Sequence, residues 1–253
     1  MHAVLGFKNG SYYPCGRKEP TIEGKQFQAL MELCFAHGDT FSLRRCDWPG
    51  AHDGALEQAL RPYILGEYDS YGHLIWFEKE YREKCFLYPA TQETKEILLS
   101  HIHHLFDRDK SLAPAGHEAY LQEKYAAYYR AAEQADDRWL DYLDQAGDDC
   151  SGEQYEADRK ESYREARELW LQVFAEEDYY SNMEDPCFFR GNEMFFETIT
   201  HEKDCFVRVL SPEFEKNLRK LGKWVNMSRQ ITLPLFSLDQ AEGWKRYEPS
   251  DLR

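Results

Sequence analysis

Apolar and small residues recur at helical spacing through the middle of the chain. Steps of four and three residues alternate along Leu121, Tyr125, Tyr128, Ala132, Ala135, Trp139 and Tyr142. This spacing is close to the 3.5-residue period of helices that pack side by side. Gly147 is a typical residue type just beyond the end of a helix. The pattern therefore predicts a long helix with one aromatic face.

A second helical pattern follows after a short polar turn. Ser151, with Gln154 three residues later, forms a capping box that marks the start of a helix, and apolar positions continue from Tyr155 to Phe174. Two helices joined by so short a turn pack antiparallel. The segment 116–185 is therefore predicted to be a long antiparallel helical hairpin.

The segments on either side of the hairpin mix short helices with aromatic strands. The patterns predict helices over 24–37, 53–60 and 91–106, strands over 41–44, 63–68, 73–77, 84–88, 187–190, 194–200 and 205–210, and a last helix opening at Ser211. This mixture predicts an α+β fold, in which helices pack on one antiparallel or mixed sheet built from both flanks. Residues 1–115 and 186–253 would then form one domain, with the acidic hairpin inserted. The alternative is two domains divided at the charged linker 107–115.

The charge of the chain is concentrated in the hairpin. Residues 116–185 hold 20 acidic and 7 basic residues, a net charge of −13 out of −15 for the whole chain. Such a balance argues against binding to nucleic-acid phosphates or to an anionic membrane, and it favours a basic protein partner. The candidate partner-binding residues are the acids around the hairpin tip: Asp136, Asp137, Asp141, Asp144, Asp148, Asp149, Glu153 and Glu156.

Composition and sequence patterns predict a cytoplasmic protein. The chain has 253 residues, of which 42% are hydrophobic, so it can bury a core. Its apolar runs are far shorter than the roughly 20 residues that a membrane span needs, and the N-terminus lacks the pattern of a secretory signal. The seven cysteines form no CxxC pair. They are therefore predicted to be reduced, buried side chains rather than zinc ligands.

A histidine cluster supports an alternative function. His101, His104 and Asp107 are three residues apart on the predicted helix 91–106, so they would share one side of it. Histidines with a carboxylate could hold Zn²⁺ or another divalent transition metal. The alternative is therefore a metal-dependent hydrolase, although the chain has no HExxH motif and no defined distant ligand. A simpler interpretation is the polar flank of a half-buried helix.

Two other clusters have weaker chemical signals. Arg44, Arg45 and Trp48 precede a glycine-containing loop and could bind an anion, although no phosphate-binding glycine motif is present. The simpler interpretation is an exposed strand end. His201 with Cys205 could form a nucleophile and base, but the acidic residues between them are typical of a hairpin turn.

The function that these patterns favour is a non-enzymatic interaction protein. An inhibitor or immunity-type protein that blocks a basic, nucleic-acid-binding enzyme would have this charge and would lack catalytic motifs. We therefore assign no catalytic residue and no cofactor to the chain.

Overall fold

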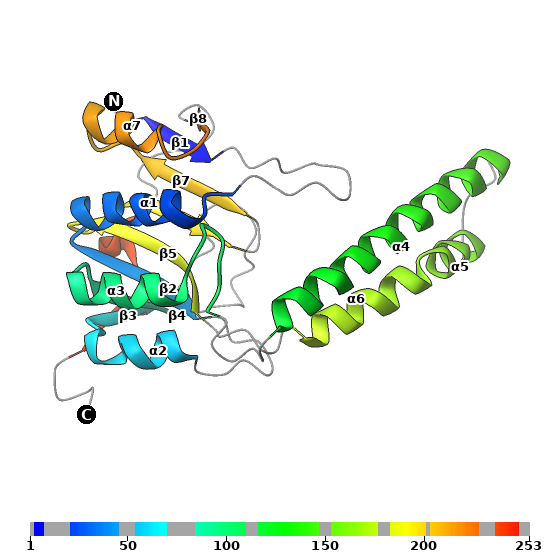
Figure 1. Ribbon diagram of the computed structural model, residues 1–253, viewed down its shortest axis with the longest axis horizontal. Coiled ribbons are helices and arrows are strands. Elements are labelled where there is room, and N and C mark those ends of the chain that lie inside the picture. Colours follow the sequence, from blue (N-terminus) through cyan, green and yellow to red (C-terminus); the bar gives the residue numbers. More distant parts are fainter. Residues whose placement is uncertain are drawn as a thin grey trace. The chain divides into compact units, whose positions relative to one another are not determined.

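The computed structural model describes residues 3–7, 21–45, 54–69, 84–109, 116–146, 153–176, 183–200, 203–227 and 236–247. The chain forms two compact units (Figure 1). One contains the sheet with four of the helices, and the other contains the long helices of the middle segment. No helix of the described part of the chain is long and apolar enough to cross a membrane.

The sheet unit is built on one antiparallel sheet. Its strands follow the order β8-β1-β7-β6-β5-β2-β4-β3-β9. The bounds are β1 (Val4–Phe7), β2 (Thr40–Arg45), β3 (Gly66–Asp69), β4 (Lys84–Pro89), β5 (Met183–Arg190), β6 (Glu193–Ile199), β7 (Asp204–Arg208), β8 (Trp224–Asn226) and β9 (Lys245–Arg246). β2 pairs with β5, which joins the two flanks of the middle segment. The prediction of an α+β fold with an antiparallel sheet is therefore confirmed.

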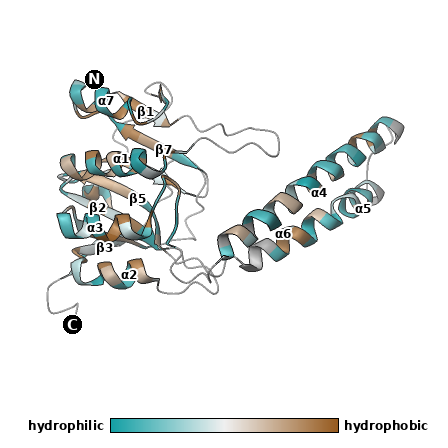
Figure 2. Ribbon diagram, in the orientation of Figure 1, coloured by the Kyte–Doolittle hydropathy of each residue, from teal (hydrophilic) through white to brown (hydrophobic). Residues whose placement is uncertain are grey.

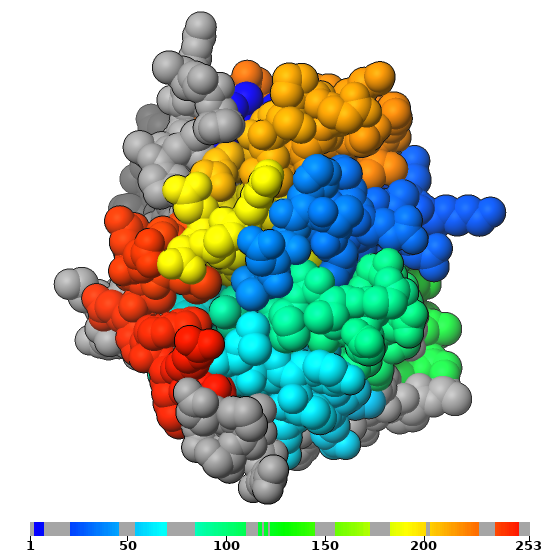
Figure 3. Space-filling model, turned by 90° about the vertical axis from the view of Figure 1, so that its left-hand side faces the viewer, coloured from blue at the N-terminus to red at the C-terminus, as the bar shows by residue number. Residues whose placement is uncertain are grey.

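Four helices cover one face of this sheet: α1 (Gly24–His37), α2 (Ala55–Leu60), α3 (Gln92–His101) and α7 (Pro212–Leu218). Figure 3 shows them as orange, blue, green and cyan bands for α7, α1, α3 and α2. In α1 the buried residues Phe27, Leu30, Met31 and Cys34 follow the helical period, which explains why this helix was predictable. The largest buried cluster of the molecule lies between these helices and the sheet.

The opposite face of the sheet has a smaller apolar cluster. The segment 236–241 packs on it: the Phe236 ring lies 5.5 Å from the Tyr68 ring and 6.4 Å from the Phe189 ring. Tyr68 also shares a hydrogen bond of 2.9 Å with Ser42 on this face. We call this the polar face of the sheet, because charged side chains are buried along it beside the apolar cluster.

The second unit consists of α4 (His117–Ala146), α5 (Glu153–Ser162) and α6 (Arg164–Glu176). α4 runs antiparallel to the other two, since Tyr128 contacts Trp170 and Tyr142 contacts Asp158. Helical hydrogen bonds continue across the junction of α5 and α6 at Tyr163. Figure 2 shows hydrophilic residues along most of α4 and α5, in contrast to the hydrophobic strands β5 and β7.

Several predicted boundaries are wrong. The helix predicted over 91–106 ends at His101, and Ile102 is extended. Leu105 then donates its backbone N–H to the Ile22 carbonyl at 2.9 Å, so pairing with another segment replaces the last helical turn. Tyr63 belongs to a 3₁₀ turn rather than a strand, and β5 begins four residues earlier than predicted. The predicted strand 73–77 lies outside the described residues.

Candidate functional site

The outward face of α4 carries a stripe of carboxylates. Asp137, Asp141 and Asp144 are exposed, and they follow Glu133 at intervals of four, four and three residues, so all four share one side of the helix. We call these four residues the acidic stripe. Within the described part of the chain none of them takes part in an ion pair. Their negative charges therefore face solvent, and no basic residue of the described ranges pairs with them.

Only part of the predicted acidic set lies in this stripe. Asp136 is exposed but accepts a hydrogen bond from the Tyr163 hydroxyl, which raises the pKa of Tyr163. Glu156 is exposed on α5, and Glu153 begins α5. Asp148 and Asp149 lie outside the described residues.

The aromatic seam between the helices fixes the direction of the acidic stripe. The Trp139 ring stacks on Tyr142 at 5.0 Å and meets the Tyr155 ring edge-on at 5.0 Å. The Tyr142 hydroxyl donates to Asp158 Oδ2 at 2.8 Å. Trp139 is buried on the side of α4 that faces α5. Asp137 and Asp141 lie two residues before and after it, on the opposite side of the helix, so their side chains face away from α5.

The second unit also exposes large apolar side chains. Leu140 is 59% exposed and Leu171 is 55% exposed, and the rings of Tyr129 and Trp170 are also more than a third exposed. Leu140 lies at the edge of the acidic stripe, next to Asp141 in the sequence. The exposed surface of α4 therefore combines carboxylates with an apolar side chain at their border.

The predicted metal ligands do not share a helical face. Because α3 ends at His101, His104 and Asp107 lie in a turn that follows it, closed by the Asp107 N–H donating to the His104 carbonyl at 3.1 Å. His104 Nε2 lies 3.2 Å from Asp107 Oδ1, and His101 Nδ1 lies 2.9 Å from the Ile97 carbonyl. No group of three or more His, Cys, Asp or Glu side chains in the described residues could hold a metal ion. The helical premise of the metal-site prediction is therefore wrong.

The predicted anion-binding arginines are engaged within the protein. Arg44 was expected at an exposed strand end, but it is buried, and its guanidinium pairs with Glu184 and, at 2.8 Å, with Asp185. Arg45 Nε lies 3.8 Å from Glu57 Oε1. Trp48 lies outside the described residues. Two carboxylates of the protein therefore occupy the positions around the Arg44 guanidinium that an external anion would need.

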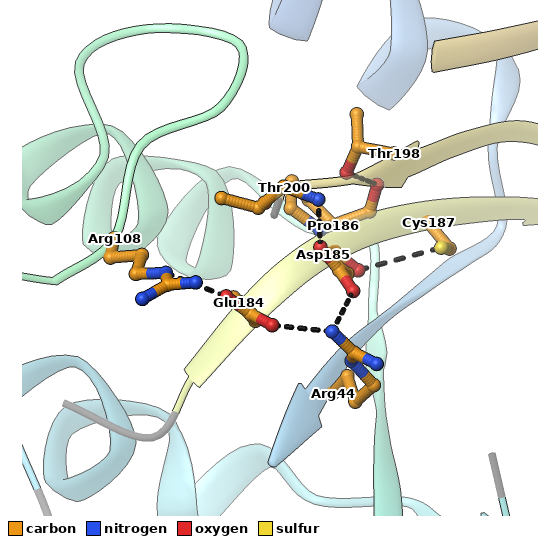
Figure 4. Close-up of polar contacts among 8 residues, drawn as sticks. All are labelled: Arg44, Arg108, Glu184, Asp185, Pro186, Cys187, Thr198 and Thr200. Atoms are coloured by element: carbon orange, nitrogen blue, oxygen red, sulfur yellow. Dashed lines mark hydrogen bonds and ion pairs between the residues drawn. The ribbon is translucent and has the colours of Figure 1, made fainter. Parts of the chain in front are cut away.

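A buried charged cluster therefore lies where the sequence predicted an exposed arginine (Figure 4). Besides Arg44, it contains Arg108, whose Nε lies 2.7 Å from Glu184 Oε2. Asp185 Oδ1 accepts the Thr200 backbone N–H at 2.6 Å. Asp185 has a φ of 58°, a left-handed backbone conformation that residues other than glycine adopt at a cost of about 1 kcal/mol or more.

The buried carboxyls of this region have raised pKa values. Burial and the neighbouring Glu184 charge raise the pKa of Asp185 to about 7, against the opposing effect of Arg44. Burial and the charges of Asp185 and Asp204 raise the pKa of Glu197 to about 8. No local pattern in the sequence distinguishes these carboxyls from surface acids, because their environment comes from strands far apart in the chain.

The described cysteines are buried and free: Cys34, Cys85, Cys187 and Cys205. The prediction of buried, unpaired cysteines is thus confirmed for these four. Burial raises the pKa of the Cys205 thiol well above its ordinary value, which disfavours the nucleophilic thiolate. His201, its proposed partner, lies outside the described residues.

Comparison with known proteins gives no match to a protein family, a curated protein or a solved structure.

Proposed function

We propose that this protein is a non-enzymatic, cytoplasmic interaction protein that binds a basic protein through the acidic stripe of α4. Within this class, an inhibitor or immunity-type protein that blocks a basic enzyme fits best. The partner would be a protein rather than a nucleic acid, since phosphates would be repelled by the same carboxylates.

One observation carries the proposal: the carboxylates of the acidic stripe have no ion pair within the described residues. Like charges four residues apart on a helix destabilise it by roughly 0.2–0.5 kcal/mol per pair. Asp137 and Asp141 form such a pair on an exposed surface, and Glu133 with Asp137 forms another. A basic partner would relieve this repulsion, so binding would stabilise α4 as well as the complex.

The chemistry of the stripe predicts how the complex would form. Complementary charges accelerate the encounter of two proteins, and this acceleration weakens as salt screens the charges. Leu140 would add an apolar contact at the edge of the charged surface. A partner that presents basic residues around a shallow apolar site would match both features.

The test compares three forms of the chain as bait in a lysate of the source cell. The first is the wild type, and the second is Asp137→Asn/Asp141→Asn/Asp144→Asn. The third, Glu123→Gln/Glu165→Gln/Glu168→Gln, removes the same number of charges from exposed positions of the same unit outside the stripe. Captured proteins are quantified by mass spectrometry at low and at high salt.

We expect a basic protein that binds the wild type and the control at low salt. It should be lost from the stripe variant and from every bait at high salt. Equal capture by all three baits, or binding that resists salt, would exclude the stripe as the binding surface. Circular dichroism of the baits controls for folding, and the stripe variant should be as helical as the wild type because repulsion has been removed.

A further inference from the structure

The strands β5 and β6 are joined by backbone pairing over only about half of their length. Their backbone pairing joins residues 188–190 to residues 193–196, whereas β5 continues beside β2 and β6 continues beside β7. Pro186 has no N–H to donate to a ladder. Beyond this pairing the strands stay side by side through two other bonds: Thr198 Oγ1 donates to the Pro186 carbonyl at 3.0 Å, and Thr200 N donates to Asp185 Oδ1 at 2.6 Å. We call this region the β5–β6 fork.

Glu197 lies in the β5–β6 fork and is fully buried. Neither oxygen of its carboxyl has a hydrogen-bond partner among the described residues. Glu197 is paired with Phe206 of β7, so its side chain lies on the polar face of the sheet. Burying a carboxylate that accepts no hydrogen bond is highly unfavourable in free energy, whereas burying the neutral acid is much less so.

Among the described residues, the charges that raise the pKa of Glu197 are Asp185 of β5 and Asp204 of β7. The neighbouring thiols are Cys187 of β5 and Cys205 of β7. Two arginines of the neighbouring strands also lie on the polar face: Arg44 of β2 is bound by Glu184 and Asp185, and Arg208 of β7 is bound by Glu193. An ionised Glu197 would therefore add a further anion beside an ion-pair cluster whose arginine is already shared between two carboxylates.

We propose that Glu197 is a proton-binding site that makes the closure of the β5–β6 fork depend on pH. With the proton bound, the neutral carboxyl is buried and the bonds of Thr198 and Thr200 hold the fork closed. When the proton is lost, the carboxylate repels Asp185 and Asp204 and requires water. The fork then opens at the end where backbone pairing is already absent.

The direction of the pH dependence follows from linkage. The pKa of Glu197 is raised to about 8 in the folded chain, while an unfolded glutamate titrates near about 4.3. Between these values the folded protein binds a proton that the unfolded chain has released. Stability therefore falls as pH rises through this window, and the fall is complete above the folded pKa.

The first test is carboxyl ¹³C NMR of glutamate-labelled protein over about pH 5 to about pH 9. Comparison of the wild type with Glu197→Gln assigns the Glu197 signal. We expect that signal to titrate near pH 8, and the amide signals of Thr198 and Thr200 to move with the same midpoint in the wild type only. Titration of Glu197 near the ordinary glutamate value would overturn the proposal, as would threonine amides that do not respond.

The second test measures the urea midpoint of unfolding over the same pH range. The wild type and the exposed control Glu32→Gln should lose stability as pH rises, whereas Glu197→Gln should show a flatter profile. A parallel fall in all three proteins would refute the role of Glu197. If Glu197→Gln does not fold, a glutamate carboxyl of the wild type that titrates near pH 8 supports the proposal, and a spectrum in which every glutamate titrates near the ordinary value overturns it.

Discussion

Replacing Arg44 with Met should destabilise the sheet unit by about 3–5 kcal/mol near neutral pH. The substitution keeps an unbranched apolar stem and removes the guanidinium that pairs with Glu184 and Asp185. Both carboxyls are buried, and removing one member of a buried ion pair leaves an uncompensated charge that costs about this amount. Glu184 keeps its contact with Arg108, and Asp185 keeps the Thr200 amide, so the loss should stay within this range.

The cost of this substitution should also depend on pH. Arg44 lowers the pKa of Asp185, so its removal raises that pKa further above the unfolded value. The folded variant then binds more protons than the folded wild type, and the difference in stability between them shrinks as pH falls. Urea unfolding at about pH 8 and about pH 5 measures both the size and the direction of this effect.

A matched control, Lys216→Met, removes a positive charge from an exposed ion pair and so shows how much of the stability loss is due to burial. Lys216 pairs with Glu213 at 3.9 Å, and both side chains are about two thirds exposed, so Lys216→Met should change stability by no more than about 1 kcal/mol. A loss for Arg44→Met as small as that of the control would refute the argument from burial. A loss that is equal at both pH values would refute the argument from Asp185.

Two substitutions test how local contacts hold the helices. Thr91→Ala removes the capping box formed with Thr94 and should cost about 1 kcal/mol in urea unfolding; a change of less than a few tenths would contradict the role of this cap. Trp139→Ala removes the ring that contacts Tyr142 and Tyr155 and should cost about 3 kcal/mol or more, seen as earlier thermal loss of helical circular dichroism. An unchanged melting profile would show that the seam does not depend on Trp139.

The prediction of α3 shows where local patterns lead to error. Ile102 and Leu105 continue the apolar spacing of this helix, and both are buried as the pattern requires. They are buried from a non-helical segment, however, because Leu105 bonds to Ile22 and His104 forms a bridge with Glu23. Periodicity predicts which residues are buried, but another segment can satisfy the same burial with a different backbone. The predicted metal site is wrong for the same reason, because His104 and Asp107 lie beyond the end of α3 at His101.

The amino-acid sequence by itself determined the α+β class, the faces of α1 and α4, and the concentration of negative charge in the middle segment. These features depend on spacing within one element or on composition, so they can be read locally. Tertiary structure alone decided the environment of Arg44, because its partner Glu184 is 140 residues away and meets it through the pairing of β2 with β5. The same pairing of distant strands buries Asp185 and Glu197. A carboxyl acquires its protonation state from the solvent it loses and the charges it meets, and both are properties of the assembled sheet.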